Sequence, residues 1–592
     1  MARREAGEKP KDFWVVLRRI FSYVSGMEFL IFIVVALCVI APLCRIAGTA
    51  LFQVITDNYL VPLSKNYDAD LFVKFTHTIC ALAAIFALGA VSICGCGQIM
   101  AYISTKILFK IRTDAFLKME TLPIRYFDAR KHGDIMSVYV NDMNNIREML
   151  TSSATDFIFN IVMTVANIAM MLYYSWKLSI VIAFVIFVMA NFIKKIVKKC
   201  GKTFREQQDE LGKLNSFVEE MIDGQKIIKI FNREEKIESD FRILNEKLYD
   251  ASRRANNYRN MLTPVLVNIS NIGYSLVVML GAIMVIRGNM TLGAAIAFFQ
   301  YARGFTFPIN EMSQGFNAVM GAAAGAERVF KLLDEEAEVD NGKIELTDAR
   351  GDIDFENVAF GYENGKTILN NINMRAHMGQ KIALAGSTGA GKTTIASLIN
   401  RFYDIGAGKI TFDGININDI KKDSLRKNVS IVLQDVNLFT ETVLENIRYG
   451  RLDATDEEVK KAAELANADQ FIGRLPNGYN TVLTDGGNDL SQGEKQLLSI
   501  ARAILSNAPA LILDEATSSI DTRTEKLIEN GMNALMKGRT VFIIAHRLST
   551  IRNSDAIIVI EGGQIIEKGT HMELLGNRGR YYQLASGLIE MG

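Results

Sequence analysis

Long apolar runs fill the first half of the chain, and they constrain its fold more than any other feature of the 592 residues. A helix needs roughly 20 mainly apolar residues to cross the hydrocarbon layer of a membrane. The fourth run is short but continues a longer helical pattern, and the sixth carries polar side chains. The first is too long for a signal-peptide core, so we expect it to be a retained span. The six predicted spans cover residues 29–53, 72–102, 156–175, 178–193, 262–286 and 291–320.

The basic residues predict how these spans are oriented. Lys and Arg gather in the N-terminal segment and in the connections between spans two and three and between spans four and five. The other connections are short and almost free of them. By the positive-inside rule, both termini and the two long connections are expected in the cytoplasm.

The two long connections keep a helical spacing of apolar residues, which predicts rods that continue the spans beyond the bilayer. Each connection is interrupted near its middle, at 122–128 by Pro123 and at 218–224 by Gly224. The residues alone leave two interpretations open. The interruptions are solvated hairpins, or they are contacts that transmit motion to the second half of the chain.

After about residue 330 the chain reads like a soluble α/β protein. The net charge of +1 gives no indication of a nucleic-acid partner. The six cysteines all lie in the first half, mostly within apolar runs, which is typical of small buried side chains. Cys94 and Cys96 are two residues apart, so on a helix they point to different faces, and this disfavours a metal or redox pair.

A complete phosphate-binding loop follows the short apolar strand expected at 381–385 and precedes a helical run. Its glycines let backbone N–H groups close around phosphate oxygens, which the positive end of the following helix also faces. Lys392 places a cation on the outer phosphates, and the Thr393 hydroxyl is a ligand for Mg²⁺. The residues expected to bind ATP here are Gly386, Ser387, Thr388, Gly389, Ala390, Gly391, Lys392, Thr393 and Thr394.

Two acidic residues end a second buried-strand pattern at 510–515. Asp514 is placed to hold Mg²⁺, and Glu515 is placed to polarise the water that attacks ATP. A carboxylate standing in solvent at the strand end is the alternative for Glu515. Between this strand and the phosphate loop, residues 490–496 open a helix whose first Ser and Gly suit an anion.

With these motifs in this order, the chain resembles the half-size exporters of the ATP-binding cassette (ABC) family, of the multidrug and lipid exporter type. The resemblance covers nearly the whole chain. It implies a multidomain protein, with an all-α transmembrane domain of six helices followed by an α/β P-loop nucleotide-binding domain. The division that we expect is an N-terminal amphipathic elbow region at 1–26, a transmembrane domain at 27–330, a linker at 331–350 and an ATP-binding cassette at 351–592.

The resemblance also assigns roles to single residues. Tyr362 matches the aromatic residue that stacks on adenine, and Gln434 matches the glutamine that senses Mg²⁺ and the attacking water. Asp521 matches the aspartate loop, and His546 matches the switch histidine that contacts the γ-phosphate. The implied metal ligands are Thr393, Gln434 and Asp514, and the implied catalytic residues are Glu515, His546 and Gln434.

In this family two nucleotide domains close head to tail on two ATP molecules. Each site is completed by the signature of the other domain, and closure switches the membrane helices from inward-facing to outward-facing. The interrupted connections then act as coupling elements. The signature residues of this chain are Ser491, Gln492, Gly493 and Glu494.

The signature departs from the family's usual Leu-Ser-Gly-Gly-Gln. Gln492 loses the backbone freedom of glycine, and Glu494 adds a negative charge close to an anion site. The residues for the chain's own ATP site are intact. This asymmetry favours a heterodimer in which this chain is the catalytically complete half, and residues 301–311 also resemble the sixth span of such halves in bacteria. A homodimer with a tolerant signature stays open.

The implied function is ATP-hydrolysis-driven export of a drug, lipid or other amphiphile by alternating access, at the bacterial cytoplasmic membrane. Gln300 and Arg303 lie one helical turn apart on the sixth run and are possible contacts for an anionic or zwitterionic cargo. The alternative is that Arg303 pairs with Glu311 or with a carbonyl and stabilises the helix. Other functions that stay open are an ATP-gated channel or sensor and a peptide exporter. The expected partners are a second half-transporter, membrane lipids and the cargo.

Overall fold

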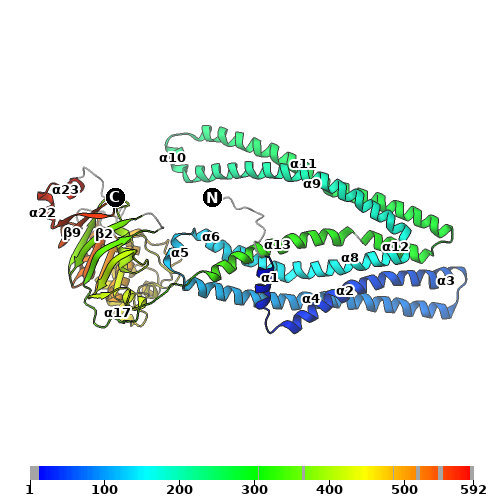
Figure 1. Ribbon diagram of the computed structural model, residues 1–592, viewed down its shortest axis with the longest axis horizontal. Helices are drawn as coiled ribbons and strands as arrows, with labels where there is room; N and C mark the ends of the chain where they lie inside the picture. Colours follow the sequence, from blue (N-terminus) through cyan, green and yellow to red (C-terminus); the bar gives the residue numbers. More distant parts are fainter. Residues whose placement is uncertain are drawn as a thin grey trace. The chain divides into compact units, whose positions relative to one another are not determined.

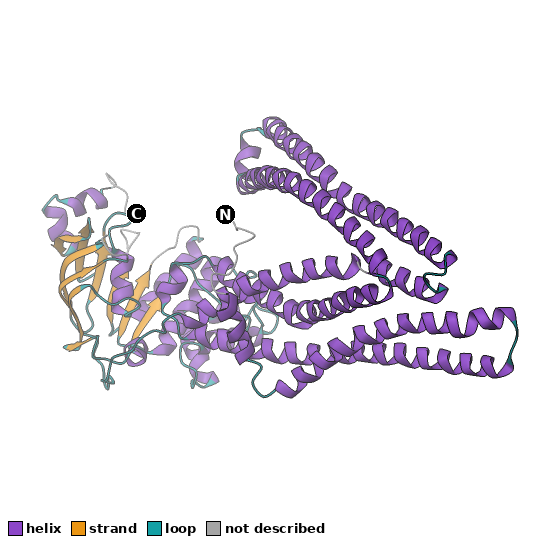
Figure 2. Cartoon of the chain, turned by 45° about the vertical axis from the view of Figure 1, so that its right-hand side comes forward, coloured by secondary structure: helices purple, strands orange, loops and turns teal. Residues whose placement is uncertain are grey.

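The computed structural model describes residues 13–304, 306–362, 367–484, 486–514, 521–544 and 551–586. The chain divides into two compact units. The first comprises Met1–Glu120 and His132–Glu335, and the second comprises Thr121–Lys131 and Glu336–Gly592. Within the described residues, the first unit is helical, whereas the second combines sheets with short helices (Figure 2).

Long helices dominate the first unit (Figure 1). They are α1 (Phe13–Ser22), α2 (Glu28–Ile55), α4 (Ala69–Glu120), α8 (Ala154–Tyr174), α9 (Trp176–Asp223), α11 (Glu234–Ile286), α12 (Leu292–Gly304) and α13 (Thr306–Asp334). Shorter segments join them: η1 (Thr56–Leu60), α3 (Val61–Lys65), α6 (His132–Ser137), η2 (Val138–Asp142), α7 (Met143–Glu148), η3 (Met149–Ser153) and α10 (Gln225–Ile230).

Five helical stretches among the described residues are long and apolar enough to cross a membrane. They match the first five predicted runs, except that residue 175 of the third run lies just beyond its stretch, which ends at Tyr174. The sixth run is shared by α12 and α13, on either side of residue 305, which lies outside the described residues. With 13 residues, α12 is too short to cross alone. A sixth span therefore stays a prediction.

The rods predicted for the long connections are confirmed. Helices α4, α9 and α11 have 52, 48 and 53 residues. At 1.5 Å per residue each is roughly 70–80 Å long, well beyond a hydrocarbon layer of about 30 Å. Gly224 ends α9, and α10 then leads into α11, which runs alongside α9 (Figure 1).

Contacts between sequence-distant residues tie the helices of the first unit together. The buried Tyr301 hydroxyl donates to the Ile46 carbonyl at 2.8 Å, and its ring stacks on Tyr174. The buried Asp142 carboxylate accepts two bonds from Arg328, at 2.8 and 2.6 Å. These bonds fix α12 against α2 and α13 against η2.

Cys96 is buried with its sulfur 3.3 Å from that of Cys38, whereas Cys94 is exposed. The two cysteines of α4 thus point to different faces, as their spacing predicts.

Within the described residues of the second unit, two sheets form the frame. A four-stranded sheet has the order β2-β1-β4-β5, and a six-stranded sheet has the order β10-β9-β3-β8-β7-β6. The strands are β1 (Ile353–Phe360), β2 (Leu369–Ala376), β3 (Lys381–Ala385), β4 (Ala407–Phe412), β5 (Ile415–Asn416), β6 (Val429–Val432), β7 (Ala510–Asp514), β8 (Thr540–Ile544), β9 (Ala556–Glu561) and β10 (Gln564–Gly569). The helices are α5 (Ile124–Asp128), α14 (Lys392–Ile399), α15 (Lys422–Lys427), α16 (Val443–Arg448), α17 (Asp456–Leu465), α18 (Asp469–Ile472), η4 (Gly478–Asn480), α19 (Gln492–Ser506), α20 (Thr522–Met536), α22 (His571–Gly576) and α23 (Arg580–Ala585).

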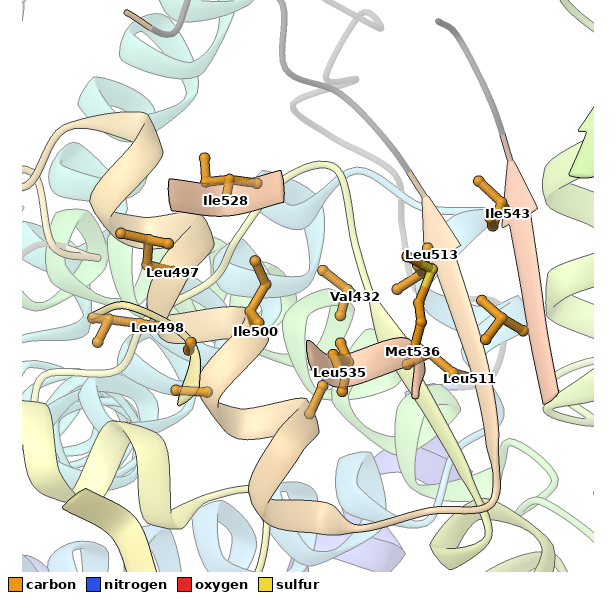
Figure 3. Packing of buried hydrophobic residues seen from close by; sticks show 14 of the residues in the cluster. Val432, Leu497, Leu498, Ile500, Leu511, Leu513, Ile528, Leu535, Met536 and Ile543 are labelled. Carbon is orange, nitrogen blue, oxygen red and sulfur yellow. The ribbon is translucent and has the colours of Figure 1, made fainter. Parts of the chain in front are cut away.

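The core of the second unit lies on both faces of the larger sheet. Its central strands β3, β7 and β8 are parallel and almost continuously apolar, as expected for strands covered on both sides. Figure 3 shows one face, where Leu513 of β7 and Ile543 of β8 lie near Met536 of α20. Leu497 and Ile500 of α19 belong to the same cluster.

Candidate nucleotide-binding site

The predicted site residues gather at one edge of the larger sheet. Strands β9, β3, β8, β7 and β6 are parallel neighbours, so their carboxyl ends meet at the same edge. The register pairs Leu384 of β3 and Asp514 of β7 with Ile544 of β8, and Val432 of β6 with Leu513 of β7. In open sheets of parallel strands, this edge is where ligands bind.

The phosphate loop leaves β3 at this edge and enters α14. Gly386, Gly389 and Gly391 all have positive φ, of 151°, 79° and 105°. A Cβ on Gly386 would lie 2.1 Å from the Ile560 carbonyl oxygen, and one on Gly391 would lie 2.5 Å from the Leu369 side chain. Glycine is therefore required at both positions by backbone conformation and by space. Gly391 is also the N-cap of α14, whose first N–H groups have no side-chain cap.

Lys392 is the buried cation of the loop. It is 5% exposed, and its Nζ donates to the Gly386 carbonyl at 2.6 Å. Burial lowers the pKa of Lys392, and the nearby Asp514 carboxylate opposes that effect. The hydroxyl-bearing residues around Lys392 differ in exposure. Ser387 is half-buried, Thr388 and Thr393 are exposed, and Thr394 is buried.

Tyr362 lies beside the start of α14. Its hydroxyl is 3.2 Å from the Thr394 hydroxyl, and its ring packs edge-on against Phe360 and Tyr403. The residue keeps 40% exposure, so part of the ring remains open to a ligand.

The acidic and amide residues occupy the same edge. Asp514 is the last residue of β7, and Gln434 is exposed in a bend two residues after β6. Glu515 and His546 follow the ends of β7 and β8 in the sequence, but both lie outside the described residues.

The signature forms the start of α19. Ser491 is the N-cap, and its hydroxyl both accepts from the Glu494 backbone N–H and donates to the Glu494 carboxylate, at 3.3 and 2.8 Å. The same carboxylate accepts from the Ser491 backbone N–H at 2.8 Å. Glu494 therefore completes a capping box, a stabilising role beyond the negative charge that it adds to the signature.

Asp521 is the N-cap of α20, and its carboxylate accepts from the backbone N–H groups of Arg523 and Thr524 at 3.0 Å. A hydrogen bond with the Thr524 side chain, together with these backbone bonds, lowers the pKa of Asp521. Capping of α20 is by itself a sufficient reason for an aspartate at position 521.

The possible cargo residues belong to the first unit. Gln300 and Arg303 are both exposed near the end of α12. Within the described part of the chain, Arg303 makes no ion pair with Glu311. The structure thus gives no support to the alternative in which this pair stabilises the helix.

Comparison with known proteins places this site in a family. Residues 31–309 match the model of the ABC transporter transmembrane region, and residues 369–518 match that of the ABC transporter. The chain is 40% identical over 584 residues to an uncharacterized ABC transporter ATP-binding protein of Bacillus subtilis, YfiC, covering 98% of this chain and 96% of that protein.

Two further relatives have more specific names. A fatty acid ABC transporter ATP-binding/permease protein of Mycobacterium bovis is 38% identical over 87% of this chain and 81% of its own length. An ATP-dependent lipid A-core flippase of Syntrophus aciditrophicus is 36% identical over 82% of this chain and 81% of its own length.

The chain belongs to the ABC transporter family. It combines the membrane region and the ATP-binding region in one polypeptide, the half-size arrangement of ABC exporters. It is a membrane protein that binds ATP and couples its hydrolysis to export.

Proposed function

We propose that this protein exports a lipid or another amphiphile from the cytoplasmic side of a bacterial membrane. The observation that carries the proposal is the match, over more than four fifths of the chain, to relatives named for fatty acids and lipid A-core. Both names describe molecules with a long apolar part and a polar or charged part. The termini and both long connections would lie in the cytoplasm, and the domain boundaries would be those expected from the sequence.

In the proposed ATP site, Lys392 pairs with phosphate oxygens in place of the Gly386 carbonyl, and the N–H groups of the loop surround the phosphates. Tyr362 stacks on adenine with its open face. Thr393, Asp514 and Gln434 are oxygen donors at one sheet edge, the donor type that suits Mg²⁺. Bound Mg²⁺ would neutralise charge on the phosphates. It needs few protein ligands because phosphates and water supply the rest.

For hydrolysis, Glu515 would accept a proton from the water that attacks the γ-phosphorus, and His546 would bind the γ-phosphate oxygens. Asp521 would lie at the contact between the two nucleotide domains. This assignment follows from the sequence motifs.

We infer that the active form is a dimer and that a heterodimer is favoured. In this chain the Ser491 hydroxyl donates to Glu494, so the serine must exchange that bond before it donates to a phosphate on the partner's site. The carboxylate also repels phosphate. Both effects weaken the site that this signature completes, whereas the chain's own loop residues are intact. The partner would then supply an ordinary signature.

For the cargo, Gln300 and Arg303 supply exposed polar groups near the end of α12. A cation on a membrane helix suits an anionic or zwitterionic headgroup if it faces a water-filled cavity. A fatty acid carboxylate fits that requirement.

Reconstitution tests the proposal. The chain is co-expressed with a half-transporter encoded beside it, purified and placed in phosphatidylethanolamine and phosphatidylglycerol vesicles. ATP hydrolysis is measured with oleate, a lysophospholipid and a cationic dye, and ATP-dependent movement of fluorescent analogues is followed. We expect stimulation by at least one amphiphile and movement that stops with Glu515→Gln. ATP-gated ion conductance without any amphiphile movement would contradict export.

A further inference from the structure

Tyr403 joins the aromatic residue of the proposed ATP site to a helix from the first half of the chain. It follows α14 by four residues and belongs to the second unit. Its ring centroid lies 4.9 Å from that of Tyr362 and 5.7 Å from that of Phe360, both in edge-on geometry. Tyr362 and Phe360 are themselves 5.0 Å apart. The three aromatic rings therefore restrict one another's orientation, because edge-on pairs have preferred geometries.

The hydroxyl of Tyr403 contacts a residue outside this cluster. It donates to the Asp128 carboxylate at 2.5 Å, and Asp128 is the last residue of α5. A hydrogen bond to an ionised carboxylate is shorter and stronger than one between neutral groups. Burial and the bond to Asp128 both raise the pKa of Tyr403, so the hydroxyl keeps its proton at neutral pH.

Tyr362 is consequently fixed at two points. Its hydroxyl contacts Thr394, in the first turn of the helix that follows the phosphate loop, and its ring edge contacts Tyr403. The remaining face is the one that would receive adenine. Any shift of the Tyr403 ring changes the orientation of that face.

We propose that Tyr403 is a positioning residue for ATP binding and that its bond to Asp128 makes ATP affinity depend on the place of α5. This inference rests on the assignment of Tyr362 to adenine under Proposed function. Helix α5 begins four residues after α4 ends, at Ile124 and Glu120. Because binding free energies are reciprocal, ATP that orders Tyr362 also holds α5.

The test is a double-mutant cycle on ATP KM, measured on the full chain with its co-expressed partner in vesicles. Tyr403→Phe removes the hydroxyl and keeps the ring, and Asp128→Ala removes the acceptor. Each is expected to raise the KM for ATP about 3- to 10-fold, the value of one hydrogen bond. The kcat should stay within about twofold, because the affected contact is at the adenine end. The double variant should be no worse than either single variant.

Two controls separate this role from a structural one. Asp128→Asn keeps an acceptor oxygen, so its KM should stay within about twofold of the unchanged protein. Asp134→Ala removes an exposed carboxylate on α6, which begins four residues after α5 ends in the sequence, and should have no effect. Thermal unfolding of each variant checks that the fold is intact.

Tyr362→Ala distinguishes the two ways of failing. If it leaves the KM for ATP unchanged, the assignment of Tyr362 to adenine is wrong. If it raises the KM, but Tyr403→Phe and Asp128→Ala do not, or add independently, then the positioning role of Tyr403 is wrong. Tyr403→Phe in the Tyr362→Ala background should add nothing.

Discussion

The two units satisfy their polar groups in different ways. In the membrane helices, many Ser and Thr hydroxyls return to the preceding turn of their own helix: Thr49 donates to the Arg45 carbonyl at 3.0 Å and Ser92 to the Leu88 carbonyl at 2.8 Å. In the second unit, several hydroxyls instead cap the next helix, as Thr455, Ser491 and Thr570 do in capping boxes. Hydrocarbon offers no other partner, whereas a helix in water needs its first N–H groups satisfied.

The two units also differ in how far their apolar side chains are buried. Trp176, Phe184 and Phe187 of α9 are more than 60% exposed in the isolated chain, whereas Leu511 and Ile512 of β7 are fully buried. Lipid is as apolar as these side chains, so exposure to it costs little. The second unit is therefore specified by continuous apolar packing. The first depends more on individual bonds between distant residues, such as that of Asp142 with Arg328.

The largest expected effect concerns chemistry confined to the second unit. Glu515→Gln should reduce ATP hydrolysis at least about 100-fold while ATP still binds, because the water loses its proton acceptor and the phosphate loop is unchanged. It should also trap the ATP-bound dimer. The measurements are phosphate release and ATP binding on the same preparation. Hydrolysis close to the unchanged rate would contradict the role of Glu515.

The next effect compares two glycines of one loop. Gly386→Ala must move the Ile560 carbonyl as well as accept positive φ, whereas Gly389 has no atom within 4 Å of an added Cβ. Backbone strain costs about 1–3 kcal/mol, so Gly386→Ala should weaken ATP binding at least about 10-fold. Gly389→Ala serves as the matched control and should weaken binding less. Equal losses would mean that space around the loop is not the determining factor.

A bond between distant residues tests the other unit. Asp142→Ala removes the acceptor of both Arg328 bonds, and we expect a loss of about 1.5–3 kcal/mol in stability. The exposed Asp134 provides the control, since Asp134→Ala should leave stability within about 0.5 kcal/mol. Thermal unfolding in detergent measures both. If the two variants behave alike, the membrane helices do not depend on this pair.

A smaller effect is expected from the possible cargo contact. Arg303→Ala should reduce oleate-stimulated ATPase about two- to fivefold, the range of an exposed charge interaction, and leave basal ATPase unchanged. Arg259→Ala, an exposed arginine of α11, is the control. An unchanged response to every amphiphile in the panel would exclude the cargo role of Arg303.

The smallest effect depends on pH and concerns the segment that leads into β1. Burial alone would raise the pKa of Glu338, but Arg426 and Lys422 outweigh it and hold that pKa below its usual value. The stability that Glu338 contributes is thus present above the usual pKa and is lost as the pH falls through the lowered one. Glu338→Gln should lower the unfolding midpoint by about 2–4 °C at neutral pH.

The gap between Glu338→Gln and the unchanged protein should close in strong acid, where Glu338 is protonated in both states. Unfolding curves across the acid range measure this gap. A gap that is the same at all pH values would show that the carboxylate charge is not what stabilises the segment.

Much of this architecture is predictable from local pattern. The first five spans, the rods of α4, α9 and α11, and the strand, loop and helix around Lys392 are each set by residues close in sequence. The spacing of apolar residues and the positions of glycines predict such features directly. The role of Glu494 was also available locally, because Ser and Glu three residues apart mark a capping box.

By itself, the sequence determined five segments that are long and apolar enough to cross the membrane, and the residues of the phosphate loop, since both follow from short-range chemistry. The tertiary structure decided which distant residues meet. No spacing relates Asp142 to Arg328, or Asp128 to Tyr403, because such pairs exist only after helices and strands have packed. The pairing of β6 with β7 likewise brings Asp514 and Gln434 to one edge of the sheet, because these parallel strands lie side by side.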